Sequence, residues 1–156
     1  MVKGLGRGDE LDGLDRMILN SLREDSRRSV KSLAEELRRP VSTVYERIKR
    51  LERRGVIRRY TVDIDYSALG YTVKALILVN VDGKHIIDLE EELAAHPNVL
   101  AVYDITGEFD VALIAAFKSI AELDAFVKSL LKSPYVKQTR TSIVFRATKE
   151  DHHLPL

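Results

Sequence analysis

Apolar residues in the first fifty positions recur at helical spacing in three separate segments. They lie three or four positions apart from Leu11 to Leu22, from Val30 to Leu37 and from Val41 to about Arg53, so each segment has one apolar face. Ser29 precedes the second segment as a candidate N-cap. Gly55 follows the third, where glycine favours the left-handed turn that ends a helix. The pattern predicts three consecutive helices.

The pattern changes to that of strands after the third predicted helix. Residues 56–65 are rich in β-branched and aromatic side chains, which predicts one or two strands. Three helices followed by a β-wing predict a winged helix-turn-helix. Beyond Leu69-Gly70 the segments follow the order strand, helix, strand, strand, helix, strand, which is ferredoxin-like. The expected strands span residues 71–81, 99–105, 109–117 and 138–145. The two helices between them carry Ile86 to Ala94 and, after a capping box of Ser119 and Glu122, Ile120 to Leu131.

These elements predict an α+β chain with an N-terminal winged helix-turn-helix and a C-terminal βαββαβ domain. A domain of this size has a thin core and often depends on a partner surface, so we expect a homo-oligomer. The expected organisation is a flexible tail over 1–8, a winged helix-turn-helix domain over 9–60, a linker strand over 61–70, a ferredoxin-like, oligomerising domain over 71–150, and a tail over 151–156.

Composition narrows the cellular setting. The chain has no cysteine, which excludes disulfides and thiolate metal sites and fits a reducing cytoplasm. The first residues lack the apolar core of a signal peptide. No apolar run approaches the roughly 18 residues of a membrane-spanning helix. We therefore expect a cytoplasmic protein without a membrane partner.

The net charge of +1 hides an uneven distribution. Residues 1–70 hold 16 Lys and Arg against 12 Asp and Glu, and residues 38–59 hold nine against two. Such a block predicts a surface that faces a polyanion. A solvated helix face is the alternative explanation of a charge run.

The third predicted helix has the features of a DNA-recognition helix. An α-helix fits the major groove, hydroxyls can donate to phosphates or bases, and Lys and Arg neutralise phosphates. Glu46 either accepts from a cytosine amino group or pairs with Arg50 one turn away. The candidate DNA-binding residues are Arg38, Arg39, Ser42, Thr43, Tyr45, Glu46, Lys49, Arg50, Arg53, Arg58 and Arg59.

Motifs of enzymes are missing from the sequence, so we expect no catalytic residues, no metal site and no cofactor. It contains no HExxH, no Gly-rich phosphate loop and no GxSxG. His85 and His96 lie at opposite ends of one predicted helix, and the His152-His153 pair is too short to indicate a metal site. The acidic residues around the turn at 104–110 suit acid–base chemistry or a cation, and equally an ordinary turn. They are Asp104, Glu108 and Asp110.

Three stretches resemble the leucine-responsive/asparagine-regulator (Lrp/AsnC) family of transcription regulators. They are LDGLDRMILNSLREDSRRS at 11–29, SLAEEL followed by STVYERIKRLERRGVI at 32–57, and TGEFDV at 106–111, which is similar to the family's Gly-x-x-Asp signature. The resemblance covers about residues 11–148. One stretch departs from it, because many members read Leu-Gly-hydrophobic-Ser where this chain has Leu37-Arg38-Arg39-Pro40. The capping serine is thereby lost, although proline suits a helix start.

The resemblance implies a sequence-specific regulator of double-stranded DNA whose C-terminal sheets pair into a homodimer. Family dimers commonly assemble further, often to octamers. It also implies that an amino acid or related small metabolite binds near the Gly-x-x-Asp turn. The implied effector-binding residues are Tyr103, Asp104, Thr106, Gly107, Asp110, Thr139 and Thr141. The alternative for this turn is that Gly107 serves only the bend and Asp110 only caps it.

Two other functions compete with this one. The first is a nucleoid-organising protein of low sequence specificity, which the sequence does not distinguish from a specific regulator. The second is an enzyme like the siroheme decarboxylases, which look like this family in both domains. Such an enzyme needs a tetrapyrrole pocket with catalytic histidine or arginine, and the second domain here offers few such residues.

Overall fold

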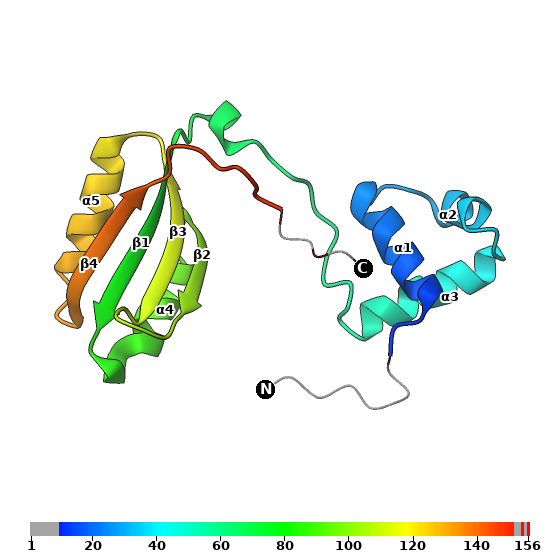
Figure 1. Cartoon of the computed structure of the whole chain (residues 1–156), viewed down its shortest axis with the longest axis horizontal. Helices are drawn as coiled ribbons and strands as arrows, with labels where there is room; N and C mark the ends of the chain where they lie inside the picture. Colours follow the sequence, from blue (N-terminus) through cyan, green and yellow to red (C-terminus); the bar gives the residue numbers. More distant parts are fainter. Residues whose placement is uncertain (1–9, 152–153, 155) are drawn as a thin grey trace. The chain divides into compact units, whose positions relative to one another are not determined.

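The computed structural model describes residues 10–151, 154 and 156, which form two compact units (Figure 1). The described residues up to Asp63, with Leu154 and Leu156, belong to the first unit, and Ile64–Asp151 form the second. The expected tail over 1–8 and the His152-His153 pair lie outside the described residues. Among the described residues, no helix is both long and apolar enough to cross a membrane.

The first unit contains the three predicted helices. They are α1 (Gly13–Glu24), α2 (Val30–Glu36) and α3 (Val41–Arg53). Ser29 caps α2 as expected, since its hydroxyl accepts from the Ser32 N–H at 3.1 Å. Asp12 is the N-cap of α1, one position ahead of the first turn. The core between the helices contains fully buried Ile18, Leu33, Val44 and Leu51.

The turn between α2 and α3 carries an unusual backbone. Arg38 adopts φ = +50°, in the left-handed region that favours glycine. Pro40 begins α3 without a side-chain cap, and its carbonyl accepts from the Val44 N–H at 3.2 Å. The helix-turn-helix therefore forms with Arg38 and Pro40 in place of the glycine and serine described above. The backbone of Arg38 is strained as a result.

The expected wing and linker strand do not form in this structure. Residues 56–65 are described throughout and contain no strand, and a short 3₁₀ helix, Tyr66–Leu69, follows them. Their apolar side chains alternate but stay exposed, as at Tyr60, Val62 and Ile64. A strand needs a hydrogen-bonded neighbour, and the described residues of the first unit include no other strand. The strand prediction was wrong because an alternating apolar pattern forms a strand only where another strand can pair with it.

The second unit confirms the predicted order of strands and helices. Its elements are β1 (Val73–Val81), a 3₁₀ turn (Gly83–His85), α4 (Ile86–Ala94), β2 (Val99–Asp104), β3 (Val111–Phe117), α5 (Ile120–Leu131) and β4 (Val136–Ile143). The four strands form one sheet in the order β2-β3-β1-β4, with every neighbouring pair antiparallel. Ser119 caps α5, and the Glu122 side chain accepts from the Lys118 N–H.

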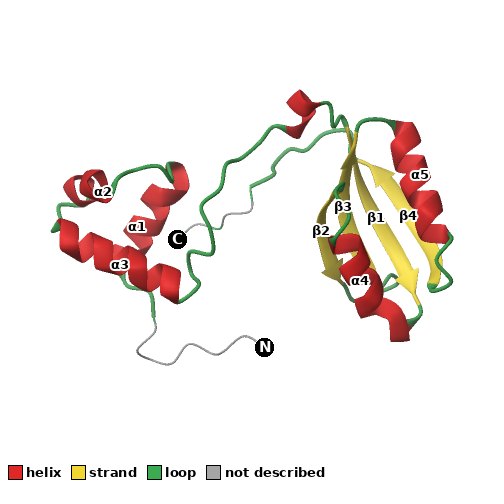
Figure 2. Cartoon of the chain, turned by 180° about the vertical axis from the view of Figure 1, so that it is seen from behind, coloured by secondary structure: helices red, strands yellow, loops and turns green. Residues whose placement is uncertain are grey.

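The two faces of this sheet differ. Both helices lie on one face (Figures 1 and 2), where Ile77, Val79 and Leu113 are fully buried beneath α4 and α5. The other face has no helix over it and carries Leu76, Leu78, Ile114 and Tyr103, of which Leu76 and Tyr103 are exposed. One face of the sheet is thus covered by helices and forms the hydrophobic core of the unit. The other face also carries apolar side chains, but no helix among the described residues covers it.

The strained turn yields a stability prediction. Replacing Arg38 by glycine should raise the free energy of unfolding of the first unit by about 0.5–1 kcal/mol, because glycine adopts positive φ without steric cost. Urea unfolding followed by far-UV circular dichroism measures the change. Arg39→Gly is the matched control, since Arg39 has no positive φ and glycine there only increases unfolded-state entropy. Equal effects of the two substitutions would contradict strain at Arg38.

Candidate DNA-binding and effector sites

Helix α3 presents a polar face opposite its buried stripe. Val44, Ile48 and Leu51 are buried. On the far side the outward residues Ser42, Glu46 and Arg53 are exposed and Lys49 is partly exposed, as the helical spacing predicted. The flanking residue Tyr45 is exposed and Thr43 is partly buried, while Arg38, Arg39, Arg58 and Arg59 are exposed in the segments before and after α3.

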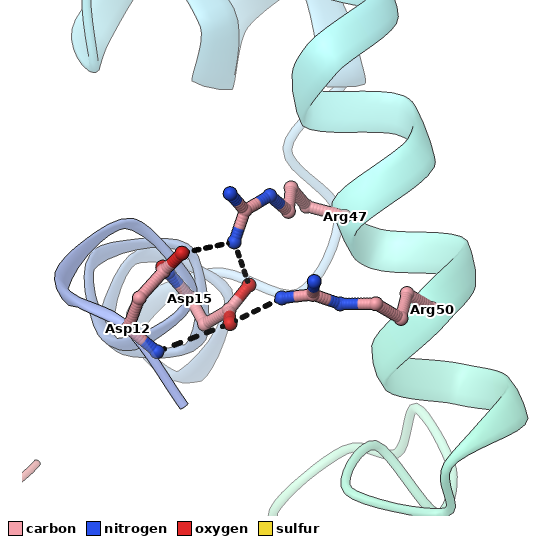
Figure 3. Close-up of polar contacts among 4 residues, drawn as sticks. All are labelled: Asp12, Asp15, Arg47 and Arg50. Atoms are coloured by element: carbon pink, nitrogen blue, oxygen red, sulfur yellow. Dashed lines mark hydrogen bonds and ion pairs between the residues drawn. The ribbon is translucent and has the colours of Figure 1, made fainter. Parts of the chain in front are cut away.

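A cluster of two carboxylates and two guanidiniums joins α3 to α1 (Figure 3). Asp15 has no exposed surface. Its Oδ2 accepts from Arg50 Nη2 at 2.6 Å and its Oδ1 from Arg47 Nη1 at 3.2 Å. Arg47 also pairs with Asp12. The Asp15 N–H and the Arg47 guanidinium together lower the pKa of the Asp12 carboxyl below its usual 3.8.

This cluster turns one DNA-binding candidate, Arg50, toward α1, and it adds Asp15 and Arg47 to the residues that matter at α3. Arg50 points to Asp15, and within the described chain no hydrogen bond or ion pair joins it to Glu46. The expected Glu46–Arg50 surface pair is therefore not formed. Neither Asp15 nor Arg47 was among the residues predicted from the sequence to take part in the site. The sequence signal that could have identified Asp15 is its spacing, because it shares the apolar stripe of Leu11, Ile18 and Leu22.

The other flank of α3 is held by a smaller network. The Glu52 carboxylate accepts from Lys49 Nζ at 2.8 Å and from the Tyr60 hydroxyl at 3.0 Å. Burial, and then the hydrogen bond to Glu52, raises the pKa of Tyr60 to about 12. The hydrogen bond from Lys49 lowers the pKa of Glu52 in turn. Lys49 therefore begins with a carboxylate partner that a phosphate would have to replace.

The turn after β2 has the geometry expected of a tight bend. Gly107 adopts φ = +124°, and a Cβ built there would meet nothing within 4 Å, so backbone conformation rather than crowding favours glycine. The Asp110 carboxylate accepts from the Val81 N–H at 2.8 Å. Asn80 Nδ2 donates to the Glu108 carbonyl at 2.9 Å. Asp110 thus ties the turn to the end of β1, with one carboxylate oxygen already engaged.

The implied effector residues do not all meet in one chain. Tyr103 and Asp104 lie on β2, at one edge of the sheet, and Thr106 is exposed in the turn that follows. Thr139 and Thr141 lie on β4, at the opposite edge. Within one chain, β3 and β1 therefore lie between Tyr103 and Asp104 on one side and Thr139 and Thr141 on the other.

One cation near the turn was also missed. Arg140 Nη2 lies 3.6 Å from Glu108 Oε1, and its guanidinium lies over the Phe109 ring at 4.9 Å. No sequence pattern pairs Arg140 with this turn, because the two meet only through the sheet register. Asp104, Glu108 and Asp110 do not form a metal site, and no group of metal-binding side chains was found among the described residues.

Models of known protein families match both units of the chain. The model of the winged helix-turn-helix DNA-binding family matches residues 11–58, and that of the Lrp/AsnC ligand binding domain matches residues 74–154. An uncharacterized HTH-type transcriptional regulator of Pyrococcus furiosus is 43% identical over 145 residues, which cover 93% of this chain and 98% of the relative.

Solved structures agree along nearly the whole chain. The transcriptional regulator NMB0573 of Neisseria meningitidis, in complex with L-Met, superposes with a TM-score of 0.88 at 28% identity, covering 94% of this chain and 97% of that one. A feast or famine regulatory protein of M. tuberculosis, complexed with L-methionine, gives 0.86 at 26% identity, with 94% and 100% covered.

Proposed function

The chain belongs to the Lrp/AsnC family of transcription regulators, and from that premise we propose that it binds specific duplex DNA sequences as a homodimer and responds to an amino acid. The observation that carries the DNA-binding part is the exposed polar face of α3 opposite a buried apolar stripe. A helix of this kind can enter the major groove with its polar side chains against base edges and phosphates.

The residues that would make these contacts have distinct roles. Ser42 and Thr43, in the first turn of α3, are placed to donate to phosphates or base edges. Lys49 and Arg53 supply charge farther along the helix, and Glu46 is free of Arg50 to accept from a cytosine amino group. Arg38, Arg39, Arg58 and Arg59 would reach the neighbouring backbone from the flanking segments.

Salt dependence tests this placement of α3. Lys49→Ala and Arg53→Ala should each weaken binding to all duplexes and reduce the slope of log K against log salt by about 1, because each removes one phosphate contact. Fluorescence anisotropy with duplexes selected from genomic DNA measures both quantities. Lys128→Ala, on α5 of the second unit, is the charge-matched control. Unchanged affinity in the Lys49→Ala, Arg53→Ala double variant would refute the placement.

We propose that the open face of the sheet is the dimer interface. Leu76 and Leu78 of β1 stand beside Ile114 and Ala112 of β3, so apolar side chains continue across neighbouring strands. Leu76 and Tyr103 are exposed on this face, and contiguous exposed apolar side chains mark an interaction site. Two copies meeting by this face would bury it symmetrically. Dimers could then assemble further, to octamers or another assembly of dimers.

The oligomeric state of a charged variant tests the interface. Leu78→Glu should shift the full chain from dimer toward monomer in sedimentation velocity, because the carboxylate would lose its hydration inside the interface. Ile87→Glu, at an exposed position of α4, is the matched control and should keep the wild-type mass. A Leu78→Glu variant with an unchanged sedimentation coefficient would place the interface elsewhere.

We propose that the turn around Gly107 binds the effector, an amino acid or related small metabolite. Two solved structures of similar fold are complexes with L-methionine. The free Oδ1 of Asp110 could accept from an α-ammonium group, while turn amides and hydroxyls of Thr139 or Thr141 from another subunit could hold the α-carboxylate. Tyr103, Asp104 and Thr106 would form the remaining wall.

A thermal-shift screen of the twenty amino acids, beginning with L-methionine, tests this site. A ligand at a hundred times its dissociation constant should stabilise the protein by about 2.7 kcal/mol. Asp110→Asn keeps an oxygen for the Val81 N–H but removes the charge, and it should abolish the shift. Asp124→Asn on α5 is the control. Equal shifts in the wild type and Asp110→Asn would move the site away from this turn.

The relatives' names also favour a regulator over an enzyme. The Pyrococcus relative that covers nearly the whole chain is named a transcriptional regulator. We propose accordingly that the protein has no catalytic activity and that its chemistry is confined to reversible binding.

A further inference from the structure

The buried carboxylate between α1 and α3 does more than fill a core position. We propose that Asp15 is a positioning residue for DNA recognition, which sets the rotation of α3 through Arg47 and Arg50 and keeps Arg50 away from DNA phosphates. The inference rests on the proposed function, in which α3 is the recognition helix. Asp15 itself is fully buried and lies on another helix, so it acts only through these two arginines.

The geometry of the cluster restrains the rotation of α3 about its own axis. Arg47 and Arg50 are three residues apart on one flank of α3, between the buried stripe and the outward face. Both converge on the single carboxylate of Asp15, whose backbone is held in the capped first turn of α1 (Figure 3). On the opposite flank, Glu52 receives Lys49 and Tyr60. Polar contacts therefore hold α3 on both sides of its hydrophobic stripe.

Small rotations of a recognition helix have large consequences for its contacts. Side-chain tips lie about 5 Å from the helix axis, so turning α3 by about 10° moves them by about 1 Å. A base-edge hydrogen bond tolerates only a few tenths of an ångström. Apolar packing by Val44, Ile48 and Leu51 is non-directional and resists such a turn weakly. A directed ion pair on the flank supplies the missing restraint.

The same cluster removes charge from the DNA-binding surface. Two carboxylates and two guanidiniums sum to zero, although Arg47 and Arg50 belong to the most basic segment of the chain. The Arg50 side chain is 40% exposed, so its guanidinium would be within reach of solvent if Asp15 released it. Its Nε–H is buried and has no hydrogen-bond partner among the described residues. Asp15 thus holds Arg50 through one nitrogen rather than a two-point fork, and neutralising this carboxylate should free it.

Two effects of opposite sign follow for Asp15→Asn. Specific binding should weaken, because α3 loses its rotational restraint. Non-specific binding should hold or strengthen, because Arg50 becomes available to phosphates while Arg47 keeps Asp12. Loss of folded protein would instead weaken both kinds of binding in parallel. The ratio of the two affinities therefore separates positioning from general stability.

The experiment uses the full chain and two DNA probes. The first is a duplex selected by the wild-type protein from a random pool, and the second is poly(dI-dC). For Asp15→Asn we expect affinity for the selected duplex to fall about tenfold or more, unchanged or higher affinity for poly(dI-dC), and a salt slope steeper by about 1. Asp25→Asn, an exposed carboxylate just after α1, should change none of these. Parallel losses on both probes would overturn the proposal.

A second variant keeps the test decisive if Asp15→Asn does not fold. Arg50→Gln should lower affinity for the selected duplex yet leave the salt slope on poly(dI-dC) at its wild-type value, because Arg50 touches no phosphate. Lys49→Gln, one position away, should lower that slope by about 1. A similar loss of slope for Arg50→Gln would overturn the proposal. A wild-type protein that selects no preferred sequence would overturn the proposed function itself, and the positioning role with it.

Discussion

The first unit depends on a charge buried where its apolar stripe would predict a hydrophobic side chain. Asp15 stands in line with Ile18 and Leu22 but has no exposed surface. A lone buried carboxylate would be costly, and removing one partner of a buried pair typically costs about 3–5 kcal/mol. The two arginines of α3 and the capping contacts with Asp12 make the position tenable. Polar contacts as well as hydrophobic packing therefore fix the arrangement of α1 and α3.

The second unit depends on a different constraint, the covering of a sheet. Two helices shield one face, and the other face keeps exposed leucine and tyrosine side chains. In the chain by itself only the first layer is complete. Within the same sheet, β3 and β1 separate the effector candidates on β2 from those on β4.

The segment that follows α3 shows that composition alone does not form a strand. Residues 56–65 have the composition of a strand, with β-branched and aromatic side chains, yet no strand is assigned there. Tyr60 is tied to the end of α3 through Glu52, so the start of this segment has a defined place against the recognition helix. Beyond it, apolar side chains such as Val62 stay exposed.

The sequence by itself determined the three helices of the first unit and the order of strands and helices in the second. Periodicity placed α3 over Val41–Arg53 and placed the βαββαβ series, because these signals depend on residues close together along the chain. Local chemistry likewise identified the caps at Ser29 and Ser119 and the bend at Gly107. The outward face of α3 followed from the same spacing. All of this requires only the 3.6- and 2-residue repeats and the preferences of single residues.

The tertiary structure decided what distant residues do to one another. It turned Arg50 from the DNA-facing set to Asp15, brought in Arg47, placed Arg140 beside the Gly107 turn and left residues 56–65 without a strand. Each outcome depends on two segments that are distant in the sequence. A strand forms only if a partner strand lies beside it, and an arginine turns inward only if a buried carboxylate is within reach. A one-dimensional pattern shows which face a side chain occupies, but the contacts on that face are set by helix packing and sheet register.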